Sequence, residues 1–166
     1  AREMHRDGSF RSGSVAIIGA PNVGKSSLIA AVSSGKPEVK SYPFTTKGVS
    51  LGHIKVKYDI IQVMDTPGLL DRPDSERNDM EKQGIAALDH LEPVIVFLTD
   101  LSGTSGYSIE IQKALHDELE NRYSGYNWID VYSKSDLESE SSLGYKNPIS
   151  ASVMDSMGIK ELESRL

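Results

Sequence analysis

The segment Gly-Ala-Pro-Asn-Val-Gly-Lys-Ser at residues 19–26 fits the pattern G-x-x-x-x-G-K-[ST], which is typical of loops that bind nucleotide phosphates. Gly19 and Gly24 let the backbone curl so that successive amide N–H groups point at phosphate oxygens. Lys25 can then reach the β- and γ-phosphates, and the Ser26 hydroxyl can ligate Mg²⁺. The sequence therefore predicts a triphosphate site at this loop.

The sequence on either side of the loop predicts the strand and the helix that such a loop connects. The apolar run 14–18 predicts a buried strand, and residues 25–32 predict a helix whose N-terminus faces the anion. A glycine-rich turn that matches the pattern by chance is the alternative, and the strand–loop–helix context argues against it.

A second motif, Asp-Thr-Pro-Gly at residues 65–68, follows the strand-like segment 60–64. An aspartate at a strand end can hold Mg²⁺ through water, and the Gly68 N–H can contact a γ-phosphate. On its own this tetrapeptide is a common turn. Its position forty residues after Lys25 makes it part of a nucleotide site.

Two further segments are similar to guanine-reading motifs. Ser-Lys-Ser-Asp at 133–136 follows the strand-like segment 128–132 and resembles N-K-x-D with its first residue changed. Ser-Ala-Ser at 150–152 follows Pro148-Ile149 and resembles the short motif whose backbone contacts the guanine carbonyl. Four motifs in this order, each after a predicted strand, indicate a G domain.

Composition agrees with one globular domain of 166 residues, with 38% hydrophobic and 25% charged residues. The sequence contains no cysteine, which excludes disulfides, thiolate metal sites and cysteine nucleophiles. It has no apolar run long enough for a membrane span and no signal-peptide pattern. A net charge of −6 argues against a general basic surface for nucleic acid, so we expect weak RNA binding by this domain alone.

The fold class expected is α/β, a three-layer P-loop G domain with a six-stranded, mostly parallel sheet and one antiparallel edge strand. Lysines alternating along residues 52–58 suggest that the second strand is this edge, paired with 60–65 through Tyr58-Asp59. The strands are expected at 14–19, 49–57, 60–65, 93–99, 127–132 and 147–150. The helices are expected at 25–33, 75–91, 107–122 and 157–166.

The sequence also predicts how the chain is divided. Residues 1–13 lack periodicity and are interpreted as a linker or tag, and residues 14–166 as a G domain cut from a longer protein. Within the third helix, Ile111, Leu115 and Leu119 recur every four residues and are expected to face the core.

The loop 35–48 should carry the hydroxyl that completes the Mg²⁺ shell when a γ-phosphate is present. Thr45 or Thr46 can supply it, and we favour Thr46. The alternative is that the two threonines only form a turn before the next strand. The four histidines are scattered along the sequence, and no His/Asp/Glu metal cluster is expected beyond the Mg²⁺ ligands.

Residues 19–27, Ser-Tyr-Pro-Phe-Thr-Thr at 41–46 and Asp-Thr-Pro-Gly-Leu-Leu-Asp-Arg-Pro at 65–73 resemble the Obg–HflX–Nog branch of GTPases. The continuation from Glu76 to Leu91, and the segment Asp100 to Gln112, are similar to the Nog type. This resemblance covers roughly residues 14–135. It implies a GTPase that acts in assembly of the large ribosomal subunit, in the cytoplasm, or in the nucleolus of a eukaryote.

Two departures bear on activity. Ser133 stands where the family usually has Asn, which should weaken guanine affinity while Asp136 preserves selectivity. Leu69 stands where Ras-like enzymes place a water-orienting Gln, so the intrinsic rate should be low.

Arg72 and Arg77 lie nearby in the sequence and are interpreted as solvated charges. Asn22 either braces the loop or, as in potassium-activated GTPases with a similar loop, helps hold K⁺ beside the phosphates.

The expected phosphate contacts are Gly19, Asn22, Val23, Gly24, Lys25, Ser26, Ser27 and Gly68. The expected metal ligands are Ser26, Thr46 and Asp65. The expected guanine contacts are Ser133, Lys134, Asp136, Ser150, Ala151 and Ser152. The expected catalytic residues are Lys25, Thr46, Gly68 and Asn22, the last as a potassium ligand.

Three functions fit these residues. The first is a Mg²⁺-dependent GTPase switch that binds GTP and GDP and engages the pre-ribosomal large subunit through the full-length protein. The second is a nucleotide-gated binding module with negligible turnover. The third is an ATPase whose base selectivity is relaxed because of Ser133.

Overall fold

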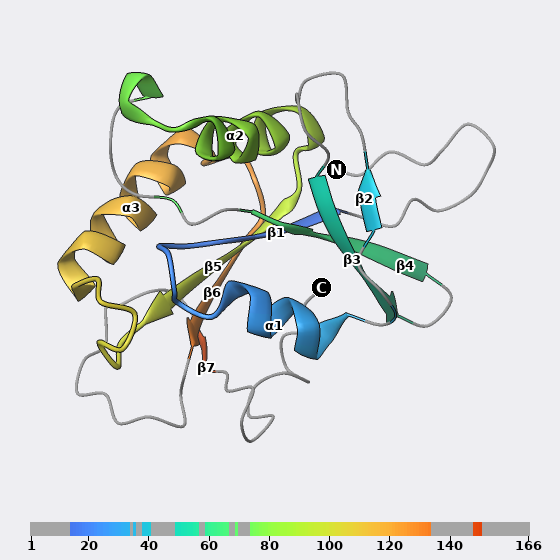
Figure 1. Ribbon diagram of the computed structural model, residues 1–166, viewed down its shortest axis with the longest axis horizontal. Coiled ribbons are helices and arrows are strands. Elements are labelled where there is room, and N and C mark those ends of the chain that lie inside the picture. Colours follow the sequence, from blue (N-terminus) through green and yellow to red (C-terminus); the bar gives the residue numbers. More distant parts are fainter. Residues whose placement is uncertain are drawn as a thin grey trace.

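The computed structural model describes residues 14–33, 35, 38–40, 49–56, 59–66, 69, 74–133 and 148–150. Within these residues a single twisted sheet is covered by helices on both faces (Figure 1). The seven strands lie in the order β2-β3-β4-β1-β5-β6-β7. Their bounds are β1 Ser14–Ile18, β2 Glu38–Lys40, β3 Val49–Val56, β4 Asp59–Asp65, β5 Val94–Asp100, β6 Trp128–Ser133 and β7 Ile149–Ser150.

Four strand pairs at the centre and on one side of the sheet are parallel: β4–β1, β1–β5, β5–β6 and β6–β7. The strand β3 pairs antiparallel with both β4 and β2, so it alone runs against the others. The six-strand prediction was therefore one strand short. The missing strand β2 covers β3, which is second from the edge and not the edge strand that the sequence suggested.

The alternation of side chains along the strands builds a core on each face of the sheet. Val15 and Ile17 of β1 pack with α1 (Lys25–Val32), whereas Ala16 and Ile18 face the opposite side. On that opposite side lie α2 (Asp79–Leu91) and α3 (Ile109–Arg122). Figure 1 shows α1 below the sheet and the other two helices above it. The expected three-layer α/β fold is confirmed.

The second helix begins later than its sequence suggested. A 3-10 turn, η1 (Asp74–Glu76), precedes it, and the helix then starts at Asp79 instead of residue 75. Asn78 is the N-cap: its side chain accepts a hydrogen bond from the Glu81 N–H at 2.8 Å, and the Glu81 carboxylate accepts from the Asn78 N–H. This capping box fixes the start of the helix.

The core-facing stripe of α3 is offset by one residue from the prediction. Leu115 and Leu119 are fully buried as expected, but Ile111 is 45% exposed. Gln112 takes the buried position instead, because its amide group is satisfied by the backbone. It accepts from the Asp100 N–H at 2.7 Å and donates to the Asp100 and Tyr107 carbonyls. The predicted helix at 157–166 lies outside the described residues.

Candidate nucleotide-binding site

The predicted motifs converge at the carboxyl edge of the parallel strands. The strand β1 leads directly into the loop 19–24, the strand β4 ends at Asp65, and the strand β6 ends at Ser133. Because these strands are parallel within one sheet, their carboxyl ends lie along the same edge. The helix α1 starts at this edge, so its N-terminal amides face the same region.

The backbone of the loop 19–24 depends on residues that tolerate unusual conformations. Gly24 has φ 105° and Asn22 has φ 64°, both in the left-handed region. Gly19 is required for a different reason, since a Cβ there would lie 2.7 Å from the Leu98 carbonyl oxygen of β5. The loop is thus pressed against the sheet at its first residue and turned sharply before α1.

Hydrogen bonds from the neighbouring motifs hold the loop and the strand that leads into it. The Leu69 N–H donates to the Gly19 carbonyl at 3.0 Å, and the Thr66 hydroxyl donates to the Ile17 carbonyl at 2.6 Å. From the other side, the Ser133 hydroxyl donates to the Val23 carbonyl at 2.6 Å. Thr66 was not among the predicted site residues, although its place directly after Asp65 in Asp-Thr-Pro-Gly was the available signal.

The Ser133 side chain contacts the phosphate loop. Its hydroxyl donates to the phosphate loop at Val23 and also lies 3.5 Å from the Thr99 carbonyl oxygen. A hydroxyl has one proton, so this donor is committed to the loop.

Lys25 lies at the centre of the loop and is only 7% exposed. Its ammonium group donates to the Ala20 carbonyl at 2.7 Å and lies 3.4 Å from the Gly19 carbonyl oxygen. Burial lowers the pKa of Lys25 to about 8, although the Asp65 carboxylate acts in the opposite direction. Burial likewise raises the pKa of Asp65, and the charge of Lys25 opposes that shift. An anionic ligand would therefore stabilise the charged form of this buried ammonium group.

We expect GTP binding to weaken as pH rises above about 8, the pKa of Lys25 in the free protein. Phosphate oxygens favour the ammonium form and raise its pKa, so affinity is constant below the free-protein pKa and falls above it. The fall should approach about tenfold per pH unit. Isothermal titration between pH 7 and pH 9 measures this, with Lys25→Ala as the control. An equally steep fall in the variant would contradict the role given to Lys25.

Two of the oxygen donors predicted for Mg²⁺, Ser26 and Asp65, belong to the elements that meet at this edge of the sheet. Ser26 is exposed at the first turn of α1, and Asp65 is half-buried at the end of β4. One hydroxyl and one carboxylate are hard oxygen ligands of the kind that Mg²⁺ prefers beside phosphates. The raised pKa of Asp65 reflects a partly desolvated carboxylate that a divalent cation would favour in its charged form.

Leu69 is fully buried in the core shared with α2 and α3. Tyr107 is half-buried and packs against the core on the α1 side.

Arg77 corrects one prediction. The sequence suggested a solvated charge, but the side chain is almost fully buried where the start of α2 meets α3. One of its guanidinium nitrogens lies 3.6 Å from the Glu118 carboxylate. The sequence could not show this, since Glu118 is forty-one positions away and only the packing of the helices joins them.

The structure describes some of the remaining predicted site residues and not others. Asn22, Ser26 and Ser27 are exposed around the loop, and Val23 is fully buried beneath it. Ser150 ends β7, beside β6. The following predicted residues lie outside the described part of the chain: Thr45, Thr46, Gly68, Arg72, Lys134, Asp136, Ala151 and Ser152.

Residues 14–131 match the family model described as "50S ribosome-binding GTPase". The chain belongs to this GTPase family. The Nog-type resemblance is also confirmed. The chain is 46% identical over 121 residues to nucleolar GTP-binding protein 1 of Encephalitozoon cuniculi. It is 43% identical over 123 residues to the Arabidopsis thaliana protein of the same name.

This chain spans only a small part of those two relatives. The matched part is 73–74% of this chain but only 23% and 18% of the two relatives. The crystal structure of a Plasmodium falciparum nucleolar GTP-binding protein 1 superposes with a TM-score of 0.74 at 30% identity. That match covers 93% of this chain and 84% of the other. The G domain of the Thermotoga maritima FeoB iron transporter, at 20% identity and a TM-score of 0.70, has the same fold; that match covers 93% of this chain and 96% of the FeoB domain.

Proposed function

We propose that this GTPase-family domain binds GTP and GDP, hydrolyses GTP with Mg²⁺, and acts as a switch in assembly of the large ribosomal subunit. The observation that carries the proposal is the phosphate loop tied by hydrogen bonds to both flanking motifs, through Leu69 on one side and Ser133 on the other. The family description and the names of the relatives support the choice of nucleotide and of the ribosome.

In this proposal the loop amides and Lys25 hold the β- and γ-phosphates, and water attacks the γ-phosphorus as the bond to the β–γ bridging oxygen breaks. Ser26, Thr46 and Asp65 would hold Mg²⁺, which when bound neutralises charge on the phosphate oxygens. Gly68 and Thr46 would respond to the γ-phosphate and so give the switch its two states.

A second candidate, a nucleotide-gated binding module with negligible turnover, is favoured by one observation. The Leu69 side chain is 0% exposed and apolar, so it cannot orient an attacking water. Low intrinsic turnover would then require a partner to supply the missing group. The third candidate, an ATPase, rests on Ser133. Its hydroxyl donates to the Val23 carbonyl, so other residues would have to recognise the base.

Single-turnover hydrolysis with excess protein tests the three candidates. Slow cleavage of GTP, with little cleavage of ATP, supports the GTPase. Binding of GTP without cleavage supports the binding module. Equal cleavage of GTP and ATP supports the ATPase and would overturn the guanine assignment.

We further propose that potassium stimulates hydrolysis more than sodium. Asn22 is exposed in the loop with φ 64°, and its side-chain amide oxygen is a group that can ligate a monovalent cation. Added positive charge offsets developing negative charge, as an arginine finger does with about 10³–10⁵-fold effects in other systems. Potassium alone should give far less. Turnover in KCl and NaCl at equal ionic strength, for wild type and Asn22→Ala, checks this. Equal rates in both salts would contradict it.

The whole protein would contact the pre-ribosomal large subunit in the cytoplasm, or in the nucleolus of a eukaryote. A net charge of −6 leaves this domain few phosphate contacts, so its own RNA binding should be weak and little affected by salt. Within the residues that the structure describes, none of the helices has the length and apolar character needed to cross a membrane.

A further inference from the structure

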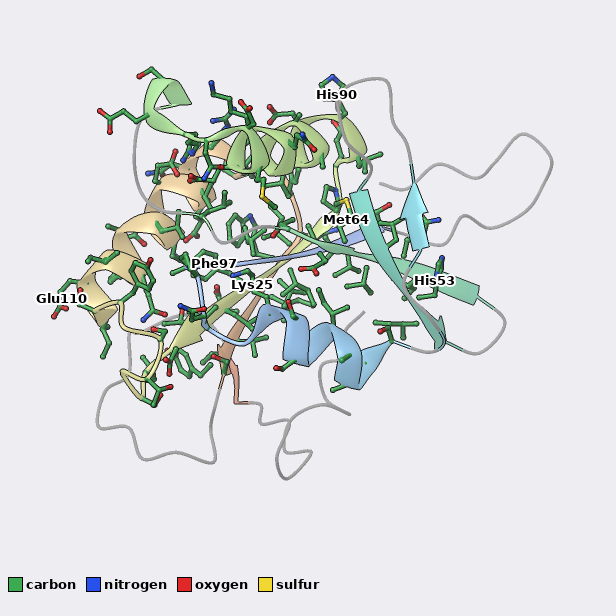
Figure 2. The ribbon with its side chains drawn as sticks, in the orientation of Figure 1. Lys25, His53, Met64, His90, Phe97 and Glu110 are labelled. Carbon is green, nitrogen blue, oxygen red and sulfur yellow. The ribbon has the colours of Figure 1, made fainter. Side chains whose placement is uncertain are left out.

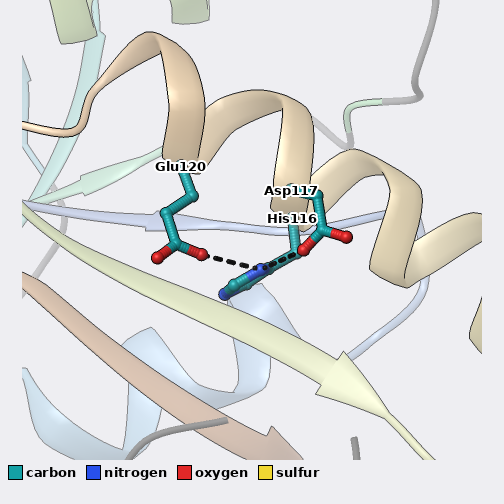
Figure 3. Close-up of side chains that lie close together, drawn as sticks. All are labelled: His116, Asp117 and Glu120. Carbon is teal, nitrogen blue, oxygen red and sulfur yellow. Dashed lines mark hydrogen bonds and ion pairs between the residues drawn. The ribbon is translucent and has the colours of Figure 1, made fainter. Parts of the chain in front are cut away.

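A histidine of α3 is surrounded by three carboxylates, contrary to the expectation of scattered histidines without a metal cluster. His116 Nδ1 lies 3.2 Å from Asp117 Oδ1 and 3.4 Å from Glu120 Oε2. Its other nitrogen, Nε2, lies 2.7 Å from Asp130 Oδ1 of β6. Figure 3 shows the imidazole directed toward the Asp117 and Glu120 side chains. The His-x-x-x-Glu spacing on a predicted helix was the signal in the sequence.

The contact with Asp130 decides how the neutral ring is protonated. At 2.7 Å, Nε2 donates its proton to the carboxylate, which leaves the lone pair of the neutral imidazole on Nδ1. That lone pair then faces Asp117 Oδ1 at 3.2 Å and Glu120 Oε2 at 3.4 Å, and both of these oxygens can only accept. A positive centre must lie between them, either a proton on Nδ1 or a bound cation.

From this geometry we propose that His116 Nδ1, Asp117 and Glu120 form a site for a divalent transition metal of the zinc class. Zinc bonds of 2.0–2.2 Å in a tetrahedron place ligand atoms about 3.3–3.5 Å apart. The two nitrogen–oxygen separations, 3.2 and 3.4 Å, agree with this spacing, and the three ligand atoms lie within 4.8 Å of one another. The fourth position would be open to water.

The residues around His116 fix the position of its imidazole ring, as outer residues do for metal-bound histidines. The carboxylate on the far nitrogen, Asp130, repeats the carboxylate–histidine–metal arrangement that fixes a ligand's tautomer and raises its basicity. The ring is also packed edge-on against Phe97, with centroids 4.9 Å apart, and against Trp128 at 5.6 Å. The imidazole is therefore positioned before any ion binds.

Charge and access both favour a divalent ion. Lys113 Nζ donates to both carboxylate oxygens of Asp117, at 2.8 Å to Oδ2 and at 3.2 Å to Oδ1, so the shorter bond goes to the oxygen that does not face His116 Nδ1. Three carboxylates and this ammonium sum to −2, so a divalent ion with a neutral imidazole brings the cluster to zero, whereas a proton leaves −1. The His116 side chain is 4% exposed, but those of Asp117 and Glu120 are 51% and 56% exposed, so an ion can enter from solvent.

Zinc binding to the chain, measured by competition with a colorimetric chelator in excess Mg²⁺, tests the proposal. Excess Mg²⁺ keeps the hard oxygen ligands of the nucleotide site occupied. We expect one Zn²⁺ per chain in wild type and a loss of binding in Glu120→Gln, whose exposed side chain can change without disturbing the fold. Asp130→Asn should weaken binding by about 10–100-fold, as is typical of such outer partners. His90→Gln, a change of an exposed histidine at the end of α2, should leave binding unchanged (Figure 2).

Cobalt gives a second measurement that does not depend on affinity alone. Co²⁺ bound to wild type should show the intense visible absorption of a tetrahedral nitrogen–oxygen site, and Glu120→Gln should lack it. Equal Zn²⁺ affinity in wild type, Glu120→Gln and His90→Gln would overturn the proposal. So would a nuclear magnetic resonance spectrum in which both His116 nitrogens stay protonated when Zn²⁺ is added, which would show that a proton alone occupies the cluster.

Discussion

Lys25→Ala is expected to lower the single-turnover rate of GTP hydrolysis by at least about 100-fold, the usual cost of removing one preorganised charge from a transition state. The ammonium group is almost fully buried at the centre of the phosphate loop, with its pKa lowered to about 8. Its charge is thus held where the phosphates would lie and is little screened by water.

Folding should survive this substitution, because a buried ammonium is desolvated at a cost that alanine does not carry. Thermal unfolding of Lys25→Ala should therefore occur at or above the wild-type temperature. Lys82→Ala, which removes an exposed lysine of α2, is the matched control and should keep the wild-type rate. A variant that stays folded and hydrolyses GTP normally would contradict the assignment of this loop.

Asp136→Asn is expected to change the preferred base from guanine to xanthine. In the proposed base site the carboxylate would accept hydrogen bonds from two base N–H groups, and an amide in its place would turn a donor toward one of these N–H groups. Each buried polar group left unsatisfied costs about 1–3 kcal/mol, so GDP affinity should fall by about 100-fold or more. Xanthosine diphosphate, whose base offers an acceptor there, should bind the variant more tightly than GDP.

Titration of wild type and Asp136→Asn with GDP and xanthosine diphosphate measures this exchange. Ser133→Asn is a useful companion, since an amide can reach both the loop and the base and should tighten GDP binding modestly. If Asp136→Asn binds GDP as wild type does, residues 133–136 are a surface turn and the base-site prediction is wrong.

The central parts of the fold were predictable because their signals are local. The run Val94–Asp100 is almost continuously apolar, as a strand buried on both faces must be, and it forms β5 with every residue buried. The strand β2 gave no such signal, since Glu-Val-Lys is too short to show periodicity. Only its pairing with β3 makes it a strand.

The parts of the site that were not predictable depend on contacts between distant segments. Ser133 and Val23 are 110 positions apart, and their hydrogen bond exists because β6 ends beside the loop. The burial of Arg77 and the cluster around His116 likewise arise where α3 packs against α2 and β6. In α3, the polar Gln112 occupies a core position that an apolar pattern assigns to Ile111, because its amide satisfies the backbone at Asp100.

The most direct test of the account is isothermal titration of the unaltered chain with GTP, GDP, ATP and ADP in the presence of Mg²⁺. A site that hydrogen-bonds the edge of guanine leaves buried groups unsatisfied when adenine enters, at about 1–3 kcal/mol each. We predict that GTP and GDP bind at one site per chain, and that the adenine nucleotides bind at least about 100-fold more weakly. Equal affinity for guanine and adenine nucleotides, or no measurable binding of either, would contradict the account.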